Sequence, residues 1–264
     1  MPTKSAQYRK QMAQSQPELT IVIPAYNEAA LIESTLEAVA AFVRERELDA
    51  EVLVVDDGST DDTGELAQKA MERLGLAGRV IRQEPNAGKG MAVRRGMLEA
   101  AGRLVLMTDA DLSTPLEEYD KLAQAIAEGA DIAIASRALP GACLEPPQPW
   151  WRQSLGQLFA LVRRMIVLPY LRDTQCGFKL WRREAAREAF SRQTITGWAF
   201  DAEVLYIADR LGYRIAELPV LWRNRRESKV KVLRDAPSVL RDLLSIRRRH
   251  RGLRPSDRAE KTQT

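Results

Sequence analysis

The 264-residue sequence predicts an α/β fold in which a mainly parallel sheet carries helices on both faces. Two observations predict it. Short apolar runs of strand length alternate, over the first half of the chain, with stretches whose apolar residues recur at helical spacing. Acidic or glycine-containing segments follow directly after several of these runs, which is where ligands bind in such sheets. A hydrophobic content of 45% is sufficient for a sizeable core.

The elements of the first half follow from these patterns in chain order. Pro24 ends the first apolar run, because proline cannot donate to a strand ladder. The helix after it is marked by apolar residues at helical spacing from Ile32 to Val43. The expected strands are Leu19–Pro24, Val52–Val55, Val80–Arg82, Leu104–Met107 and Ile132–Ala135. The further expected helices are Leu66–Leu74, Lys89–Ala101 and Pro115–Glu128.

The second half is assigned from composition and spacing. The proline-rich segment Pro140–Trp150 is interpreted as a loop over the sheet that serves as a lid. Gln157–Leu171 carries apolar residues at helical spacing around two arginines and predicts a buried helix, with an interfacial helix that receives a lipid chain as the alternative. A last helix begins near Asp201 and runs to about Leu211.

We divide the chain into three parts. Residues 1–17 are polar and form a flexible lead-in, residues 18–240 form one domain, and residues 241–264 form a basic tail. Within the domain, residues 18–136 form a nucleotide-binding half and residues 137–240 form an acceptor half.

The composition excludes several classes of protein. The longest stretch without Asp, Glu, Lys or Arg is Gln153–Val162, far short of the roughly 18 apolar residues that span a bilayer. The N-terminus has no apolar segment typical of a secretory signal, so we expect a cytoplasmic protein. Cys143 and Cys176 form no metal-binding spacing and are expected to be packing residues. His250 is the only histidine and lies in the basic tail, which excludes histidine-dependent triads and metal sites.

The net charge of +4 is unevenly distributed, because arginines cluster between Arg241 and Arg254 and further basic residues lie at 223–234. Such a cluster is either a solvated helix end followed by disorder or a surface that contacts anionic lipid. Nucleic acid is not expected as a partner, because no DNA-binding or RNA-binding motif accompanies the charge.

Asp109 and Asp111 are the strongest candidates for a functional site. They follow the apolar run Leu104–Met107 and are separated by one residue. Paired carboxylates at the end of a strand suit Mg²⁺ or Mn²⁺ carrying a diphosphate, because these ions prefer oxygen ligands. Two acids before a helix also serve simply as a cap, so this pair alone does not decide between the two interpretations.

Three other segments lie at predicted strand ends or helix starts. In Pro24–Glu28, Asn27 is a candidate helix cap and Tyr26 a candidate contact for a nucleobase. In Asp56–Thr63, Ser59 or Thr60 is the expected cap, which leaves Asp56 and Asp57 unexplained by capping. Asn86–Gly90 combines two glycines with a lysine at a helix start, a pattern that favours a phosphate but equally suits a plain turn.

Taken together in this order, these motifs resemble the family 2 glycosyltransferases, which have the GT-A fold with a Rossmann-like, mainly parallel sheet. The resemblance covers about residues 18–234 and is closest to the dolichyl-phosphate glucosyltransferase branch. It implies a nucleotide-sugar donor, UDP-glucose for the glucosyl branch, together with a divalent metal (Mg²⁺ or Mn²⁺) and a polyprenyl-phosphate acceptor. The later segments that carry the resemblance are Ser136-Arg137, Asp173–Lys179, Gly197–Asp201, Glu217–Val220 and Ser228-Lys229.

The resemblance also implies roles for individual residues. Pro24, Tyr26, Glu28 and Asp56 would hold the nucleoside, and Lys89 would contact a phosphate. Asp109 and Asp111 would hold the metal and the diphosphate. Arg137, with one or more of Arg223, Arg225, Arg226 and Lys229, would bind the acceptor phosphate. Asp111, Asp173, Asp201 and Arg137 form the expected catalytic set. Many relatives carry transmembrane helices, whereas this sequence has no apolar stretch long enough to span a bilayer. We therefore expect peripheral attachment at the inner membrane face.

The acceptor chemistry has independent support. A phosphate monoester is mostly a dianion at neutral pH and attacks the anomeric carbon without a strong base, in one displacement with inversion. With a hydroxyl acceptor, Asp173 or Asp201 would have to act as base, whereas with a phosphate either acid only orients. Three alternatives remain at this stage: a glycosyltransferase with a soluble acceptor, a nucleotidyltransferase, which would need a glycine-rich loop after the first strand, and a non-catalytic sugar-nucleotide-binding protein.

Overall fold

The computed structural model describes residues 16–145, 166–223 and 232–257. Its centre is a seven-stranded sheet in the order β3-β2-β1-β4-β7-β5-β8, and β6 and β9 form a separate parallel pair. The strands of the large sheet are β1 (Leu19–Ala25), β2 (Ala50–Asp56), β3 (Gly78–Arg82), β4 (Leu104–Met107), β5 (Ile132–Ser136), β7 (Lys179–Arg182) and β8 (Ile215–Pro219). The small pair is β6 (Cys143–Glu145) and β9 (Leu221–Arg223).

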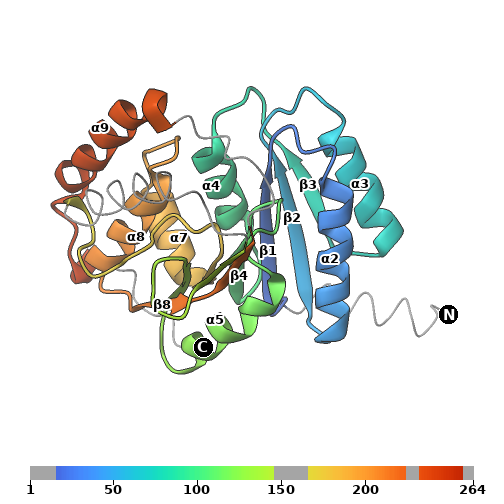
Figure 1. The fold of residues 1–264 in the computed structure, drawn as a ribbon, viewed down its shortest axis with the longest axis horizontal. Coiled ribbons are helices and arrows are strands. Elements are labelled where there is room, and N and C mark those ends of the chain that lie inside the picture. The colour runs from blue at the N-terminus through green and yellow to red at the C-terminus, as the bar shows by residue number, and fades with distance from the viewer. Residues whose placement is uncertain (1–15, 146–165, 224–231, 258–264) are drawn as a thin grey trace.

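The helices cover both faces of the sheet, as predicted (Figure 1). They are α2 (Ile32–Glu45), α3 (Thr63–Leu74), α4 (Lys89–Glu99), α5 (Tyr119–Ala127), α7 (Arg183–Ser191), α8 (Phe200–Arg210) and α9 (Val232–His250). Two short 3₁₀ helices, Leu116–Glu118 and Pro255–Asp257, precede α5 and follow α9.

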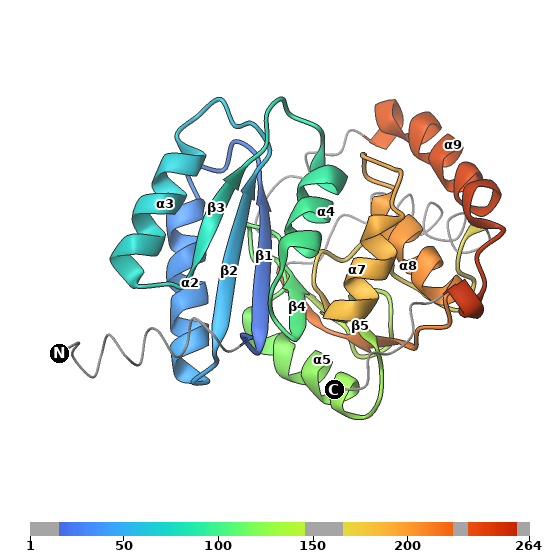
Figure 2. The ribbon, with the colours of Figure 1, turned by 180° about the vertical axis from the view of Figure 1, so that it is seen from behind.

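Each face of the sheet has its own core. Successive residues of β1 alternate between the two, because neighbouring side chains of a strand point to opposite faces: Ile21 and Ile23 pack with α2, α3 and α5, whereas Val22 packs with the other face. On that second face, α4, α7, α8 and α9 surround Trp181 and Phe200 (Figure 2). All the strands and helices expected in the first half are present, with ends that differ by a few residues.

The elements that were not assigned from the sequence are β6, β7, β8, β9 and α7, and β7 is the one in the interior of the large sheet. Its four residues, Lys179–Arg182, begin and end with a charged side chain and so give no apolar run. β7 lies between β4 and β5 and is antiparallel to both, and Lys179 pairs with Met107 on one side and Ile134 on the other. Residues from the expected acceptor half therefore complete the sheet of the nucleotide-binding half.

The C-terminal segment differs from the expected tail. The boundary proposed at residue 241 falls inside α9, and Leu243 and Ile246 of this helix are fully buried. His250, expected in a solvated tail, is buried and its Nε2 lies 2.8 Å from Glu203 Oε1 of α8. Residues 241–250 are therefore part of the folded domain, and their arginines lie on the outer side of a packed helix.

Two segments of the second half, Pro140–Trp150 and Gln157–Leu171, differ in part from what the sequence predicted. The segment expected as a loop at Pro140–Trp150 contains β6 in its described part, which pairs with β9. The helix expected at Gln157–Leu171 falls largely outside the described residues, and within them helical structure ends at Ile166 while Val167, Leu168 and Leu171 are buried. No helix among the described residues combines the length and apolar character needed to cross a membrane.

Candidate functional site

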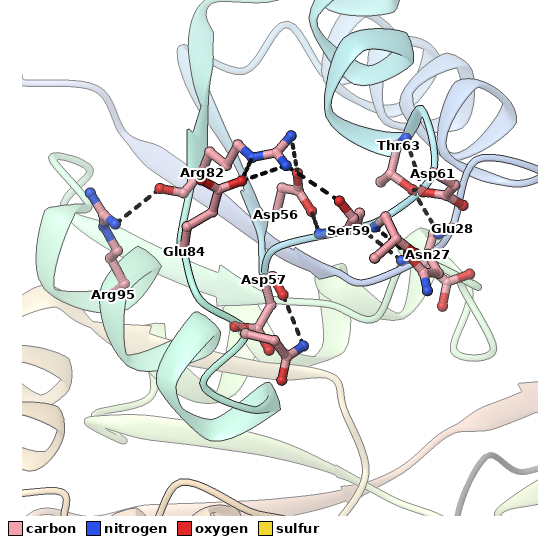
Figure 3. Close-up of polar contacts among 12 residues, drawn as sticks. Asn27, Glu28, Asp56, Asp57, Ser59, Asp61, Thr63, Arg82, Glu84 and Arg95 are labelled. Carbon is pink, nitrogen blue, oxygen red and sulfur yellow. Dashed lines mark hydrogen bonds and ion pairs between the residues drawn. The ribbon is translucent and has the colours of Figure 1, made fainter.

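The turns after β1 and β2 are cross-linked into one unit (Figure 3). The backbone N–H of Asn27 donates to Ser59 Oγ at 3.0 Å, and the N–H of Thr60 donates to Asn27 Oδ1 at 2.9 Å. The N–H of Glu28 donates to Thr63 Oγ1 at 2.8 Å. Asn27 has a positive φ of 52°, which asparagine tolerates better than most residues.

These contacts overturn the expected helix caps. Asn27 does not cap α2, whose N-cap residue is Leu31, and neither Ser59 nor Thr60 caps α3, whose N-cap residue is Asp62. Their polar groups instead join the two turns, because loops that lie side by side at a sheet edge satisfy one another's backbone groups. Asn27 and Ser59 therefore fix the shape of the strand-end surface and not the start of a helix.

Asp56 lies at the end of β2 and has no exposed surface. Its Oδ1 accepts the N–H of Ser59 at 2.9 Å, whereas Oδ2 accepts no hydrogen bond from the described residues and lies 3.7 Å from Arg82 Nη1. Gly64 faces this oxygen, and a Cβ there would come within 2.9 Å of it. A buried acceptor without a hydrogen bond is costly unless a ligand completes it, so Asp56 is a strong candidate binding residue.

An open cleft of about 710 Å³ lies beside this turn. Ser59, which donates to Asp56, and Arg82, which lies against it, both line the cleft. The guanidinium of Arg82 also donates to Glu84 at 2.6 Å, and Arg95 donates to the carbonyl of Arg82 at 3.2 Å (Figure 3). Asp56 itself is fully buried and does not line the cleft, but it contacts Ser59 and Arg82, which do.

Asp57, next in the chain, has a different role. Its carboxylate accepts the N–H groups of Ala87 and Gly88, each at 2.9 Å, and the side-chain amide of Gln83 at 2.6 Å. The Asn86–Gly90 loop was expected to offer these N–H groups to a phosphate. That expectation is wrong for Ala87 and Gly88, because the anion they bind is the protein's own Asp57.

Lys89, the first residue of α4, reaches the end of β4. Its Nζ lies 2.6 Å from Asp109 Oδ1 and 5.5 Å from the centre of the Trp198 ring. On the other side, Asp109 lies against Gly177, where a Cβ would come within 2.1 Å of Oδ2. Asp111 Oδ1 accepts the N–H of Ser113 at 2.9 Å in the turn that follows. The predicted pair of acids thus lies at the strand edge, with a lysine bound to one of them.

A buried ion pair lies close to Lys89 and Asp109. Lys179 of β7 donates to Asp201 of α8 and, at 2.6 Å, to the carbonyl of Cys176, and both charged side chains are almost fully buried. Burial raises the pKa of Asp201 above its ordinary value, although Lys179 and Lys89 oppose this effect. The Asp201 carboxylate is bound to Lys179, so in this arrangement Asp201 is a structural counterion of β7.

Arg137 and Asp173 form a second pair beside β9. Arg137 donates to Asp173 through Nε at 2.7 Å and Nη2 at 3.0 Å, and its guanidinium lies 5.7 Å from the centre of the Trp222 ring. Burial alone would lower the pKa of Arg137, but the Asp173 carboxylate outweighs it and raises the pKa, so Arg137 stays charged. Glu217 accepts the N–H groups of Arg172 and Asp173 and fixes this turn.

The structure places the predicted site residues unevenly. Pro24 is the sixth residue of β1, Tyr26 is 41% exposed directly after that strand, and Glu28 belongs to the cross-linked turn. Arg225, Arg226 and Lys229 lie outside the described residues. Arg223, in β9, donates its backbone N–H to the carbonyl of Ser113, close to Asp111 in sequence. The residues that sequence reasoning missed are Gly64, Arg82, Gly177, Lys179 and Trp198.

The chemistry of Asp109 and Asp111 fits a divalent cation. Both are hard oxygen donors at a strand end, and Gly177 leaves room for one of them. Within the part of the chain that the structure describes, no group of three His, Cys, Asp or Glu side chains is gathered to hold a metal. Two carboxylates are enough for a Mg²⁺ site, because this ion takes further ligands from substrate phosphates and water.

This chain resembles known proteins both in sequence and in structure. The family model for glycosyl transferase family 2 matches residues 20–190. A dolichyl-phosphate beta-glucosyltransferase of Trichomonas vaginalis is 38% identical over 81% of this chain and 66% of its own length. Enzymes of the same name from Drosophila melanogaster and Homo sapiens are 36% and 34% identical, over 87% and 88% of this chain and 74% and 76% of their own.

Solved structures give the same architecture. Glucosyl-3-phosphoglycerate synthase of Mycobacterium tuberculosis superimposes with a TM-score of 0.63 at 22% identity, covering 94% of this chain and 86% of its own. Mannosyl-3-phosphoglycerate synthase of Rubrobacter xylanophilus gives a TM-score of 0.61 at 20% identity, covering 100% of this chain and 82% of its own. At this level of identity, these likenesses support the fold alone.

Proposed function

Because this chain belongs to glycosyl transferase family 2, we propose that it transfers glucose from UDP-glucose to a dolichyl or other polyprenyl phosphate, with inversion. One observation carries the proposal: relatives more than 30% identical over more than 80% of this chain bear the name of that activity. The placement of Asp56, Asp109 and Asp111 along the strand ends supports it, since a nucleotide and its diphosphate bind at this edge in open α/β sheets.

The uracil base fits the cleft beside Asp56. Uracil presents one N–H donor between two carbonyl acceptors, so it requires an acceptor and a donor close together. Asp56 Oδ2 is a buried acceptor without a hydrogen bond, and the Arg82 guanidinium lies 3.7 Å away. Pro24 near the end of β1, with Tyr26 and Glu28 on the adjoining turn, would support the base and ribose.

The metal would be held by Asp109 and Asp111. When bound, a divalent cation supplies neutralisation of the charge that develops on the departing diphosphate. Lys89 already lies 2.6 Å from Asp109 and is therefore within reach of a diphosphate at this site. Mg²⁺ and Mn²⁺ share the preference for oxygen ligands, so either ion is compatible with these two carboxylates.

The acceptor phosphate would lie on the basic side formed by Arg137 and β9. One acceptor oxygen forms a bond to the anomeric carbon as the bond from that carbon to the diphosphate breaks, and UDP leaves with the electron pair. The nucleophile is already a dianion, so the protein's task is to hold two anionic substrates together. Arg137 would shift part of its bonding from Asp173 to the acceptor, with Arg223, Arg226 and Lys229 as further candidate contacts. Asp173 would then act as an orienter.

The outer side of α9 provides a surface for a membrane that holds the acceptor. Leu240 is 39% exposed and Leu244 is 58% exposed, one helical turn apart. Exposed arginines flank them at positions 241, 247, 248 and 251. Apolar side chains among arginines are typical of helices that lie at the surface of anionic lipid, so we propose peripheral contact through this helix at the cytoplasmic face.

A direct assay tests the proposed activity. Purified protein is incubated with UDP-glucose, GDP-mannose or UDP-GlcNAc, a polyprenyl phosphate and Mg²⁺ or Mn²⁺, and the products are weighed by mass spectrometry. A polyprenyl phosphate that gains one hexose from UDP-glucose supports the proposal. Parallel reactions with glycerate and sugar phosphates test a soluble acceptor, and turnover with those acceptors alone contradicts the lipid assignment.

A further inference from the structure

The contact between Lys89 and Asp109 is unusual for its position in the fold. Lys89 is the first residue of α4, where the helix dipole disfavours a positive charge. Its ammonium nevertheless lies 2.6 Å from Asp109 Oδ1 with three quarters of its side chain covered. The stability of α4 does not explain a lysine here, whereas the carboxylate in front of it does.

Lys89 occupies the position that a cation at Asp109 requires. Gly177 packs against this carboxylate, because a Cβ at residue 177 would come within 2.1 Å of Oδ2 and 2.8 Å of Oδ1. Asp109 Oδ1 is the oxygen bound to Lys89. A divalent ion that binds Asp109 through this oxygen must displace the ammonium.

The charges around Lys89 make such displacement unfavourable for a metal alone. Asp109, Asp111 and Asp201 all attract the Lys89 ammonium, and Lys179 neutralises Asp201. A divalent cation that binds without a nucleotide would add positive charge close to Lys89 and Lys179. A nucleotide that binds without a cation would add negative charge close to Asp109, Asp111 and Asp201. A divalent cation and a doubly anionic diphosphate cancel each other, which matters most where water is largely excluded.

We propose that Lys89 is the resident counterion of Asp109, which keeps divalent metal out until a sugar nucleotide arrives and so makes metal and donor binding cooperative. When the donor binds, the Lys89 ammonium would turn from Asp109 to the diphosphate, which would leave the Asp109 carboxylate available to hold a divalent cation. Trp198, whose ring centre lies 5.5 Å from Lys89 Nζ, supports the side chain beside both positions. This inference rests on the proposed function, because it assumes that Asp109 and Asp111 bind the metal.

The test measures metal binding and not activity. Mn²⁺ binding is followed by the electron paramagnetic resonance signal of free Mn²⁺, with and without saturating UDP. In the unaltered protein, UDP should tighten Mn²⁺ binding at least about tenfold, within the usual range of coupling between two sites. Lys89→Met, which removes the charge and keeps the stem, should tighten binding of Mn²⁺ alone by about tenfold and reduce the effect of UDP.

Three variants make the result specific. Lys89→Arg keeps the charge and should leave the affinity for Mn²⁺ alone close to that of the unaltered protein. Lys69→Met removes the same charge from the exposed pair that Lys69 forms with Glu65 on α3, and should change nothing. Asp111→Asn should weaken Mn²⁺ binding both in the unaltered protein and in Lys89→Met. This result would show that the Mn²⁺ measured is bound at Asp111. A gain in affinity cannot arise from damage to the fold.

The outcomes separate this inference from the proposed function. If Lys89→Met binds Mn²⁺ alone no more tightly than the unaltered protein, while UDP still promotes Mn²⁺ binding in both, the counterion role is wrong and the metal site stands. If the unaltered protein binds no Mn²⁺ even with UDP, both the metal site and the counterion role are overturned. By linkage, Mn²⁺ must tighten UDP binding by the same factor, which gives an independent check by calorimetry.

Discussion

Asp111 is the residue at which metal binding can be removed with the least disturbance of the fold. Its Oδ1 accepts the N–H of Ser113, and the amide oxygen of asparagine accepts the same bond. We expect Asp111→Asn to abolish metal-dependent transfer while unfolding free energy changes by no more than about 0.5 kcal/mol, as for most partly exposed substitutions. Transfer rates across a Mn²⁺ titration, beside thermal unfolding, measure both. Full activity in this variant would reject the metal role.

Gly177 tests how closely the site is packed around Asp109. A methyl group at residue 177 would overlap Asp109 Oδ2, which lies 2.1 Å from the ideal Cβ position. We expect Gly177→Ala to displace this carboxylate, to reduce transfer by at least about tenfold, and to cost about 1–3 kcal/mol of stability as overpacking does. Steady-state kinetics and urea unfolding measure the two effects.

The matched control is Gly252→Ala, because nothing lies within 4 Å of a Cβ at that position. This variant should keep both activity and stability. Unchanged kinetics in Gly177→Ala would mean that Asp109 does not need its present position.

For individual residues, the sequence predicted which side chains belong to the candidate site better than it predicted the directions in which those side chains point. Asp56 and Asp57 are adjacent and chemically identical, yet Asp56 lies against Arg82 with one carboxylate oxygen that accepts no hydrogen bond, whereas Asp57 binds the Ala87 and Gly88 amides. Opposed directions of successive side chains at a strand end produce this division, and no residue pattern identifies in advance which acid has an internal partner. Arg82 was missed for a related reason, since an arginine on a short strand resembles any surface charge.

Among the secondary-structure elements, helix α9 also shows what the sequence could not predict. Its arginines were interpreted as a basic tail, either a solvated helix end followed by disorder or a surface that contacts anionic lipid. Neither interpretation included the buried Leu243 and Ile246, three residues apart, which hold the helix against α8. The charge run obscured two apolar positions at helical spacing. β7 was missed because four residues with charged ends carry no strand signal, and its place between β4 and β5 is decided by tertiary pairing.

The link between α8 and α9 predicts a dependence of stability on pH. Burial would raise the pKa of Glu203, but His250, Thr194 and the amides of Thr194 and Ile195 outweigh it and lower the pKa. Because the pKa in the folded state is below that of the unfolded chain, this stabilisation is complete above the unfolded value and is lost as pH falls through the folded value. We expect unfolding free energy to decline on the acid side, and Glu203→Gln to lack this part of the decline.

Urea unfolding between about pH 3 and pH 6, the range in which glutamates titrate, measures this difference. Glu72→Gln, on the exposed side of α3, is the control and should follow the unaltered protein. Parallel profiles for Glu203→Gln and the unaltered protein would show that the contact with His250 contributes nothing to the folded state.

For the whole molecule, the exposed side of α9 predicts how the protein meets a membrane. Removing residues 241–264 would also remove Leu243 and Ile246 from the core, so point substitutions are the sharper test. We expect Leu244→Glu and the pair Arg247→Glu with Arg248→Glu to reduce binding to anionic vesicles, each arginine contributing about 1 kcal/mol near such a surface. Vesicle sedimentation at low and high salt measures the loss.

Transfer to a short-chain, water-soluble polyprenyl phosphate should remain unchanged in these variants, since none of the three residues belongs to the proposed donor or acceptor sites. Arg187→Glu, on α7, reverses an exposed charge elsewhere and serves as the control. Undiminished binding of the α9 variants to anionic vesicles would exclude this helix as the membrane contact.

The position of β7 also governs when the enzyme becomes competent during synthesis. Lys179 pairs with both Met107 and Ile134, so β4 and β5 leave the ribosome well before the strand that joins them. Until then, a nascent chain has two incomplete sheet edges, which are the kind of surface that chaperones protect from aggregation. Gly177 and Lys179 arrive together with β7, so the donor site is completed as β4 and β5 are joined, before β8 is added at the edge of the sheet. A chain that stalls before β7 has no means of consuming sugar nucleotide.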